Sequence, residues 1–567
     1  MLKKTMEKKR HLKISRIKDS KLYQLVKVYF NWSLKKRLIW SLIFATIRIV
    51  FSLAWPYLLY KQLFQNEKIE TDSLSYVIPI VIAIFSISQW AVYKQLLTNI
   101  KINDQISLKL ITDLWRKMVS LEWLSFKSKN RVYYFDIFLV DFWRIRHGIM
   151  ALLEVIIPYS VISFALLFFL LYISPPIFIL YLIGFVLTTA FQLISNLKLR
   201  TFIRKFHEAW RKQSINVSVS IDQYDLVRMD RGYEQSSNNF NKNSAEFLDA
   251  NSKMLIAQSK WKIIIQIVIQ FTRLAVLVTG IYWVNSGLIS WGEFFFTIFV
   301  IGIIQTNLTQ LPGGINELLE ALESFNRMNE YFDLDSEKNI NQLGNEALTK
   351  TIDSIAIQDM DFGYDTKKTL FEDYSISLKK GNVYLWVGPN GSGKSTLSHI
   401  LMGLIKPKRG ELKINEISLN WDELKLLRSD FAFIHQDALL FAGSIKENIT
   451  FGHESTIESW EKVKKSWLSN LLPSGIIEPD RRIGERGEGL SGGEAKRIIL
   501  IREWLRSCQL IVLDEPLNHL DSQSIKYVTK EIEILKKDAI IIIISHQSGF
   551  ESIADEIIEI NKKKWKI

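Results

Sequence analysis

Six long apolar segments constrain the fold of this chain more than any other feature. Each is about 20 residues or longer, enough to cross the hydrocarbon core of a bilayer as a helix. They cover residues 38–60, 74–97, 149–173, 176–196, 261–286 and 293–315. A backbone in lipid must satisfy its hydrogen bonds internally, so we expect a membrane α-helical bundle with six transmembrane helices.

Lys and Arg residues gather on one side of these segments. They crowd residues 1–37, whereas the connections 61–73 and 287–292 carry few of them. The positive-inside rule therefore places the N- and C-termini in the cytoplasm. A net charge of +13 together with 48% hydrophobic residues favours a multi-pass membrane protein with membrane lipid as a partner, and no nucleic acid. The richness in Lys, Ile and Asn suggests a bacterium, and hence its plasma membrane.

The chain divides into four predicted ranges. Residues 1–37 are a basic N-terminus, where "LYQLVKVYFNW" is either an elbow helix in the membrane interface or simply the start of the first span. Residues 38–325 are the transmembrane domain, whose polar connections are expected to continue its helices into the cytoplasm. Residues 326–350 are a linker. Residues 351–567 form a separate domain, in which a single cysteine, Cys508, leaves no partner for an internal disulfide.

This last domain has the pattern of a parallel α/β fold. Short apolar runs alternate with helical stretches: "NVYLWVG", "DFAFIHQ", "LIVLDE" and "AIIIIIS". Runs of this length, bounded by turn or charged residues, are typical of strands buried on both faces. The sequence therefore predicts a membrane bundle joined to an α/β domain.

The first of these runs leads into "VGPNGSGKSTL", which fits the P-loop pattern between a strand and a helix. Its glycines let the backbone wrap around phosphates, Lys394 would reach the β- and γ-phosphates, and Ser395 would bind Mg²⁺. A chance glycine-rich turn is the alternative. The predicted nucleotide-binding residues of this loop are Gly388, Pro389, Asn390, Gly391, Ser392, Gly393, Lys394, Ser395 and Thr396.

Two further strand ends carry candidate catalytic groups. "LIVLDEP" ends in Asp514, placed to hold Mg²⁺, and Glu515, a candidate general base for the attacking water. "IIIISHQ" ends in His546, which would lie near the γ-phosphate. A carboxylate pair or a lone His at a strand end is more often structural, but the P-loop upstream favours the catalytic interpretation.

A second phosphate cradle is indicated by "LSGGE", where small residues precede a helical run. With this stretch the domain resembles the nucleotide-binding domain of ABC (ATP-binding cassette) transporters, and the whole chain resembles a bacterial ABC exporter half-transporter. The membrane half is similar more loosely, through "FKSKNRVYYFDIFLVDFWRIRHGI", "SIDQYDLVRMDRGYEQSSNNF" and the ends of the sixth span.

The resemblance implies roles for single residues. Tyr364 would stack on adenine, and Gln436 would sense Mg²⁺ and the γ-phosphate, so that the Mg²⁺ set is Ser395, Gln436 and Asp514. Asp521 would cross to a second domain. The signature would close the nucleotide of a partner chain through Ser491, Gly492, Gly493 and Glu494. ATP and Mg²⁺ are the implied cofactors, and a homodimer is the favoured assembly.

This sequence departs from the usual motif residues of ABC exporters at three places. Glu494 stands where Gln is common, His435 where Pro is frequent, and the stretch "LNHLD" is unusual. None of these removes a group that hydrolysis needs. We therefore expect a competent ATPase coupled to transport.

The spans contain polar residues that favour a polar central cavity, because ionisable groups at membrane depth are costly. The candidates are Arg48, Glu154, Gln266, Gln270, Arg273 and Gln305. Structural ion contacts or a snorkelling Arg are the alternatives. Such a cavity suits an amphipathic or polar cargo, with a peptide first, then a lipid, lipid-linked precursor or drug. A membrane sensor gated by ATP is a further alternative.

Overall fold

The computed structural model describes residues 32–64, 71–229, 232–337, 351–364, 369–435, 440–452, 463, 478–518, 520–545 and 550–560. The described chain forms two compact units. The first takes in the residues up to Ser120 and Lys127–Leu334, and the second takes in Leu121–Phe126 and the residues from Asp335 onward. The candidate elbow helix before residue 32 lies outside the described residues.

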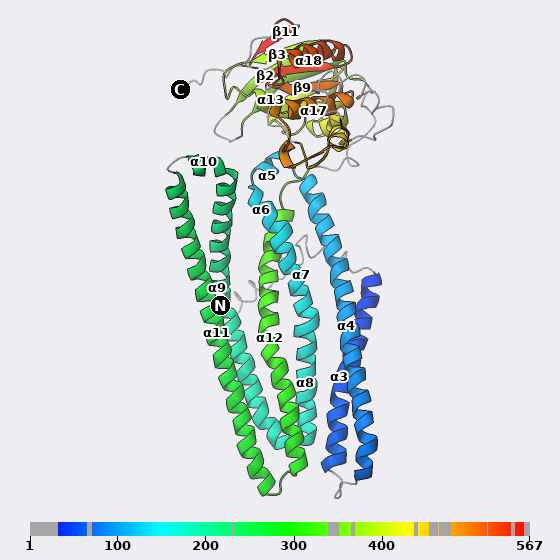
Figure 1. Ribbon diagram of the computed structural model, residues 1–567, viewed down its shortest axis with the longest axis vertical. Helices are drawn as coiled ribbons and strands as arrows, with labels where there is room; N and C mark the ends of the chain where they lie inside the picture. The colour runs from blue at the N-terminus through cyan, green and yellow to red at the C-terminus, as the bar shows by residue number, and fades with distance from the viewer. Residues whose placement is uncertain are drawn as a thin grey trace, which may run out of the picture. The chain divides into compact units, whose positions relative to one another are not determined.

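The regular structure among the described residues of the first unit is helical, and all six predicted apolar segments lie in its helices (Figure 1). Among the residues that the structure describes, five helices are long and apolar enough to cross a membrane, and α3 holds the remaining segment. The elements are α3 (Trp32–Phe64), α4 (Thr71–Val119), α6 (Arg131–Phe135), η1 (Asp136–Asp141), α7 (Phe142–Met150), η2 (Ala151–Ile156), α8 (Ile157–Ile173), α9 (Pro175–Asp222), α10 (Tyr224–Met229), α11 (Gly232–Asn285) and α12 (Trp291–Phe332).

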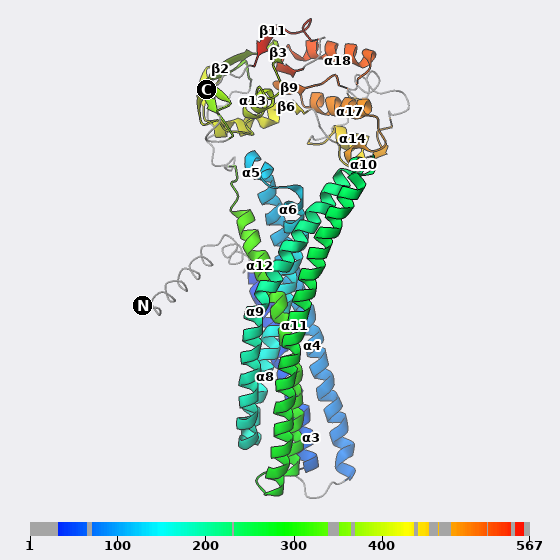
Figure 2. The same ribbon diagram turned by 90° about the vertical axis from the view of Figure 1, so that its left-hand side faces the viewer.

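Local sequence explains where several of these helices begin. Pro175 and Pro176 open α9, because proline fits the first helical turn, where its missing N–H would have no partner. Ser290 caps α12 in a capping box with Glu293. Both views show α9 and α11 side by side, joined through α10 (Figures 1 and 2). The long polar connections are thus helical, as the sequence predicts.

The end of α12 corrects the predicted linker 326–350. The helix continues to Phe332, and the boundary between the units falls after Leu334. No Gly or Pro lies between Asn326 and Phe332, and Met328 and Tyr331 are fully buried. The Tyr331 hydroxyl also donates to the Leu114 carbonyl at 2.9 Å, so packing against α4 holds this last turn in place.

The second unit contains two larger sheets and a two-stranded antiparallel pair of β7 (Gly443–Ser444) and β8 (Arg482–Ile483). A parallel sheet has the order β11-β3-β10-β9-β6, and four of its five strands, β3, β10, β9 and β6, are the four predicted strands. An antiparallel sheet with the order β2-β1-β4-β5 adds to it. The strands are β1 (Ser354–Phe362), β2 (Phe371–Lys379), β3 (Val383–Val387), β4 (Arg409–Ile414), β5 (Ile417–Leu419), β6 (Phe431–Ile434), β9 (Leu510–Asp514), β10 (Ile540–Ile544) and β11 (Glu556–Glu559).

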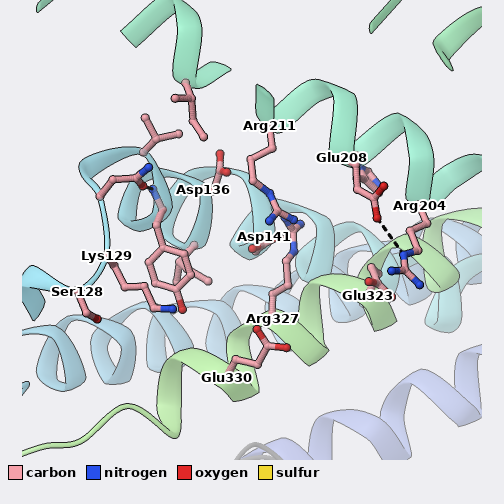
Figure 3. A pocket seen from close by; sticks show the side chains of 16 residues that line it. Ser128, Lys129, Asp136, Asp141, Arg204, Glu208, Arg211, Glu323, Arg327 and Glu330 are labelled. Atoms are coloured by element: carbon pink, nitrogen blue, oxygen red, sulfur yellow. Dashed lines mark hydrogen bonds and ion pairs between the residues drawn. The ribbon is translucent and has the colours of Figure 1, made fainter. Parts of the chain in front are cut away.

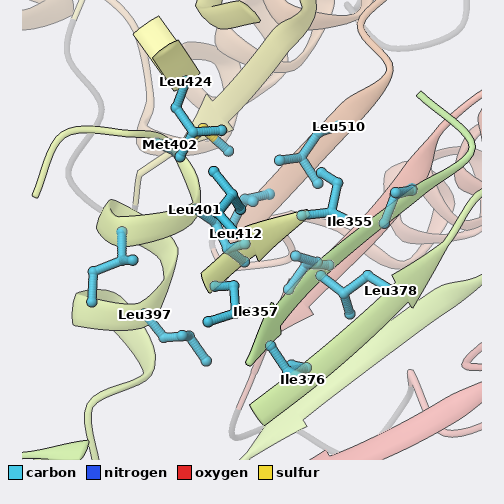
Figure 4. Close-up of a cluster of buried hydrophobic side chains, with 14 of the residues drawn as sticks. Ile355, Ile357, Ile376, Leu378, Leu397, Leu401, Met402, Leu412, Leu424 and Leu510 are labelled. Carbon is cyan, nitrogen blue, oxygen red and sulfur yellow. The ribbon is translucent and has the colours of Figure 1, made fainter. Parts of the chain in front are cut away.

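Both faces of the parallel sheet are buried. Side chains alternate along β9, so that Ile511 and Leu513 pack into one hydrophobic cluster and Leu510 and Val512 into another. In Figure 4, Leu510 lies with Leu401, Leu412 and Ile355 in the second cluster. Helices α13 (Lys394–Leu401), α14 (Ile445–Ile449), α17 (Gly492–Leu505) and α18 (Ser522–Leu535) complete the unit. The unbroken apolar runs in the sequence follow from this two-sided burial.

A short segment from far upstream also belongs to the second unit. The Glu122 N–H donates to the Asp335 carbonyl at 3.1 Å, and Leu121 pairs with Ser336 in an antiparallel bridge. The Trp123 ring, at the start of α5 (Trp123–Lys127), lies 5.1 Å from the His399 ring on α13. The α/β unit is therefore assembled from two separate parts of the chain.

Candidate functional site

The loop 388–393 joins β3 to α13 as the P-loop pattern predicts. Gly388 has a φ of +152° and Gly393 a φ of +107°, a region that side chains rarely adopt. A Cβ at Gly388 would collide with the Ile560 carbonyl oxygen, and one at Gly393 would lie 2.6 Å from Phe371 Cζ. Both glycines are thus required for a loop that curls over the end of β3.

Polar groups of this loop are arranged to meet an anion. Lys394 Nζ donates to the Gly388 carbonyl at 2.7 Å and to the Pro389 carbonyl at 3.2 Å, so the ammonium lies within the curl. Ser392 Oγ is buried and has no hydrogen-bond partner among the described residues. Burial lowers the pKa of Lys394, and the nearby Asp514 and Glu515 carboxylates oppose this effect. The loop therefore fits a nucleotide phosphate chain.

The acid pair lies at the same edge of the sheet as the loop. β10 pairs with β3 on one side and with β9 on the other, all parallel, so their carboxyl ends lie together. Asp514 ends β9 and is 6% exposed, and burial raises the pKa of its carboxyl. Glu515 has a φ of +47°, its N–H donates to the Ile544 carbonyl at 2.9 Å, and Ser545 Oγ donates to its Oε2 at 3.3 Å.

Oxygen ligands suited to Mg²⁺ are present at this edge. Ser395 is exposed in the first turn of α13, directly after the loop that follows β3. The described residues contain no group of three or more His, Cys, Asp or Glu that could hold a metal ion by itself. Mg²⁺ typically takes one or two protein ligands together with phosphate oxygens and water, so Ser395 and Asp514 fit it. Gln436 and His546 lie outside the described residues, after β6 and β10.

Tyr364 lies beside the P-loop helix. Its hydroxyl shares a hydrogen bond of 3.0 Å with Thr396 Oγ1, and its ring packs edge-on against Phe362 at 5.1 Å. The side chain is 61% exposed, which leaves one side of the ring open for a base to stack on. Pro389, Asn390 and Gly391 are exposed at the rim of the loop.

The stretch "LSGGE" begins α17 with a capping box. Ser491 Oγ accepts from the Glu494 N–H at 3.3 Å, and the Ser491 N–H donates to Glu494 Oε2 at 2.8 Å. Glutamate serves this motif as well as glutamine does, which gives the departure at Glu494 a structural reason. Ser491 and Gly492 are exposed, whereas Gly493 is buried. The helix N-terminus thus presents a positive dipole end outward from its own unit.

Asp521 is engaged within its own chain. It caps α18 by accepting from the Ser524 N–H at 2.9 Å, and it pairs with Arg497 Nη2 on α17 at 3.3 Å. The hydrogen bond with Ser524 lowers the pKa of its carboxyl. Sequence reasoning missed Arg497 and Ser545 as neighbours of the site. Only the helical spacing from Ser491, and the position of Ser545 directly after a strand, could have indicated them.

The six candidate cavity residues have separate surroundings in the first unit. Arg48 lies over the Tyr159 ring at 5.5 Å, and Glu154 Oε1 is buried with no hydrogen-bond partner among the described residues. Gln305 Nε2 donates to the Ile269 carbonyl at 3.5 Å. The exposed residues of the set are Gln266, Gln270 and Arg273 on α11. The structure describes no hydrogen bond or ion pair that joins any two of the six.

Together, the fold and the site define a membrane-embedded P-loop nucleotide-binding protein. Residues 38–308 match the family described as the ABC transporter transmembrane region, and residues 371–518 match the family described as ABC transporter. The chain belongs to the ABC transporters, as a half-transporter that fuses one transmembrane region to one ABC ATPase domain. ATP and Mg²⁺ are the cofactors of that domain.

Similar proteins include the ATP-dependent lipid A-core flippase 2 of Colwellia psychrerythraea, 29% identical over 60% of this chain and 59% of that protein. A multidrug resistance ABC transporter of Lactococcus lactis is 26% identical over 61% of this chain and 58% of that protein. The matches thus span little more than half the length of these relatives. A bacterial Atm1-family ABC exporter with ATP bound has the same fold, with a TM-score of 0.82, 18% identity, and coverage of 94% of this chain and 95% of that one.

Proposed function

We propose that this protein is an ATP-driven exporter of the bacterial plasma membrane that works as a homodimer, with both termini in the cytoplasm. The observation that carries the proposal is the pairing of two phosphate-binding features in one unit. The P-loop curls over its own Lys394, while the N-terminus of α17 presents Ser491 and Gly492 to the outside. A second copy, packed head to tail, would bring each exposed signature to the other chain's P-loop.

The residues of one composite site then have distinct tasks. The Lys394 ammonium and the loop N–H groups would hold the phosphates, and Ser395 and Asp514 would hold Mg²⁺, which when bound would supply positive charge to the phosphate oxygens. Glu515 orients and deprotonates the attacking water, held in place by Ser545. Ser491 of the partner chain supplies a further donor to the γ-phosphate. The second units of the two chains would close on bound nucleotide and separate after hydrolysis. This movement would drive the membrane helices between two states.

An amphipathic or polar cargo is proposed, with a peptide as the first candidate. Polar and charged side chains inside the apolar segments, such as Arg48, Glu154 and Arg273, support it because they suit a cargo with hydrogen-bonding groups. Lipid or drug export is the second candidate, and it is favoured by relatives named as a lipid A-core flippase and a multidrug transporter.

The test is ATP-dependent accumulation of cargo in inverted vesicles that contain the full chain. We expect a labelled peptide, lipid or drug to accumulate with ATP and Mg²⁺, and Lys394→Ala to abolish accumulation. The exposed Lys205 on α9 provides a matched control, because Lys205→Ala leaves the P-loop intact. ATPase activity with no flux of any of the three cargo classes would instead favour an ATP-gated sensor.

A further inference from the structure

A polar pocket lies in the first unit. It has a volume of about 570 Å³ and is formed by the loop before α6, by η1, by α9 and by the last turns of α12 (Figure 3). This is within the range of pockets that take small organic ligands. Arg211 follows the apolar segment 176–196 by about 22 Å of helix, so the pocket lies beyond the membrane-spanning part of α9.

His207 is the feature of this pocket that calls for a ligand. Its side chain lines the pocket, is 7% exposed, and has no hydrogen-bond partner for either ring nitrogen among the described residues. A buried imidazole carries one donor or two, and leaving them unmet costs free energy. Its packing partner is the Phe206 ring, at 5.3 Å, which offers no acceptor. A bound group with an anionic oxygen would satisfy it.

Charges around His207 are nearly balanced. Two ion pairs neutralise part of the lining: Arg327 with Asp141, and Arg204 with Glu208 at 3.0 Å. The side chains left without an ion pair, among the described residues, carry both signs: Lys129 and Arg211 are basic, and Asp136, Glu323 and Glu330 are acidic. In Figure 3, Arg211 and Arg327 reach from α9 and α12 toward Asp141, while Glu330 lies further along α12.

This balance selects among ligand chemistries. A polyanion such as a phosphate-rich headgroup needs an excess of basic side chains, which the pocket lacks. A purely apolar molecule would leave His207, Arg211 and Glu330 unsatisfied. A molecule with one carboxylate and one ammonium group would meet Arg211 and His207 at one end, and Glu323 or Glu330 at the other. Two or three linked amino acids have the size and the charges.

We propose that this pocket binds a short zwitterionic peptide through its free carboxylate and its free ammonium group. The role of this pocket rests on the proposed exporter function. In that function, the pocket is the place where a cargo from the cytoplasm first binds to the helices of the first unit. Arg211 and His207 hold the carboxylate, and the acidic side chains of α12 hold the ammonium group. The pocket thereby selects cargo by its termini rather than by its apolar surface.

The probe is an equimolar pool of uncapped tripeptides, incubated with the full chain in lipid nanodiscs without nucleotide. Retained peptides are identified by mass spectrometry, and the best is compared with its N-acetylated and C-amidated forms. We expect saturable binding that either cap weakens at least about tenfold, since a charge-assisted hydrogen bond is lost. Equal binding of capped and uncapped forms, or no saturable binding because a second copy covers the pocket, overturns the proposal.

Single and combined variants show which side chains bind the carboxylate end of the peptide and which bind its ammonium end. Arg211→Gln should remove the preference for a free carboxylate while keeping that for a free ammonium group, and the double change Glu323→Gln with Glu330→Gln should do the reverse. His207→Phe keeps the ring volume and should weaken the uncapped peptide at least about tenfold. Arg200→Gln, an exposed arginine on α9 outside the pocket, is the matched control and should bind as the parent does. If Arg200→Gln changes binding as much as Arg211→Gln, general charge and not the pocket is responsible.

The assay separates this proposal from the exporter proposal, because it needs neither ATP nor flux. Binding that is sensitive to the caps, without any transport, would support the peptide pocket and contradict the exporter function. Transport without such binding would support the exporter function and contradict the peptide pocket.

Discussion

Ser491 has two roles in this structure and in the proposed dimer, and Ser491→Asp separates them. In its own chain the side chain caps α17, and aspartate is as good an N-cap as serine. The free energy of unfolding should therefore change by no more than about 0.5 kcal/mol. In the dimer, however, the new carboxylate would face the γ-phosphate of the other chain's nucleotide.

The size of the effect follows from Coulomb's law. Two unit charges about 4 Å apart at an effective dielectric constant of about 20 repel by about 4 kcal/mol. Since about 1.4 kcal/mol is a factor of ten, closure of the site should be disfavoured roughly 10³-fold. ATP should still bind to the P-loop, because Ser491 does not form part of it.

The assay is ATPase turnover, nucleotide binding and thermal unfolding of the full chain in nanodiscs. Ser444→Asp is the matched control, because Ser444 caps α14 in the same kind of capping box with Glu447, at 3.0 and 2.7 Å. We expect Ser444→Asp to hydrolyse ATP at close to the parent rate. Turnover within twofold of the parent in Ser491→Asp would refute the assignment of the signature to a partner's phosphate.

Three further predictions concern the P-loop and the acid pair. Glu515→Gln should bind ATP normally but lose turnover, because the amide cannot take a proton from water; normal turnover in the variant would remove Glu515 as the base. Gly388→Ala should abolish nucleotide binding, because the new Cβ collides with the Ile560 carbonyl oxygen at a φ of +152°, whereas Gly313→Ala, with open space around it, should bind as the parent does. The pH profile of ATPase turnover should fall on both sides. Asp514 must be ionised to hold Mg²⁺, and burial raises its pKa above the ordinary 3.8, so activity present above that pKa is lost as the pH falls through it. Burial lowers the pKa of Lys394 below the ordinary 10.5, so its charge is lost as the pH rises through the lowered value. A rate that stays constant on the acid side down to the ordinary carboxyl range would contradict this ionisation.

The sequence predicted the parts of the fold that local pattern determines. Apolar runs predicted the positions of the spans and the strands. The loop 388–395 could be predicted because a phosphate-binding loop accepts few residue types at fixed spacing. The antiparallel sheet escaped prediction because pairing between β1 and β4 joins residues far apart, and their alternation is interrupted by register shifts. The extension of α12 was missed because its polar surface reads as a linker, while Met328 and Tyr331 are buried only by partners on other helices.

The candidate site shows the same division. Lys394, Asp514 and Glu515 were identified from motifs, whereas the partners that orient them were not. Ser545 reaches Glu515 only because β10 lies beside β9, and Arg497 reaches Asp521 only because α17 packs near the start of α18. Such contacts depend on strand order and helix packing, which no spacing in the sequence encodes.

The short stretch Leu121–Phe126 has a consequence for how the protein is made. On the ribosome it emerges before α8, α9, α11 and α12, yet its place is in the unit that begins at Asp335. The ring of Trp123 can contact the ring of His399 only after these membrane helices have been synthesised, because His399 follows them in the chain. The α/β unit can therefore take up this segment only after α8, α9, α11 and α12 have been synthesised, so its folding cannot be completed from the C-terminal part of the chain alone.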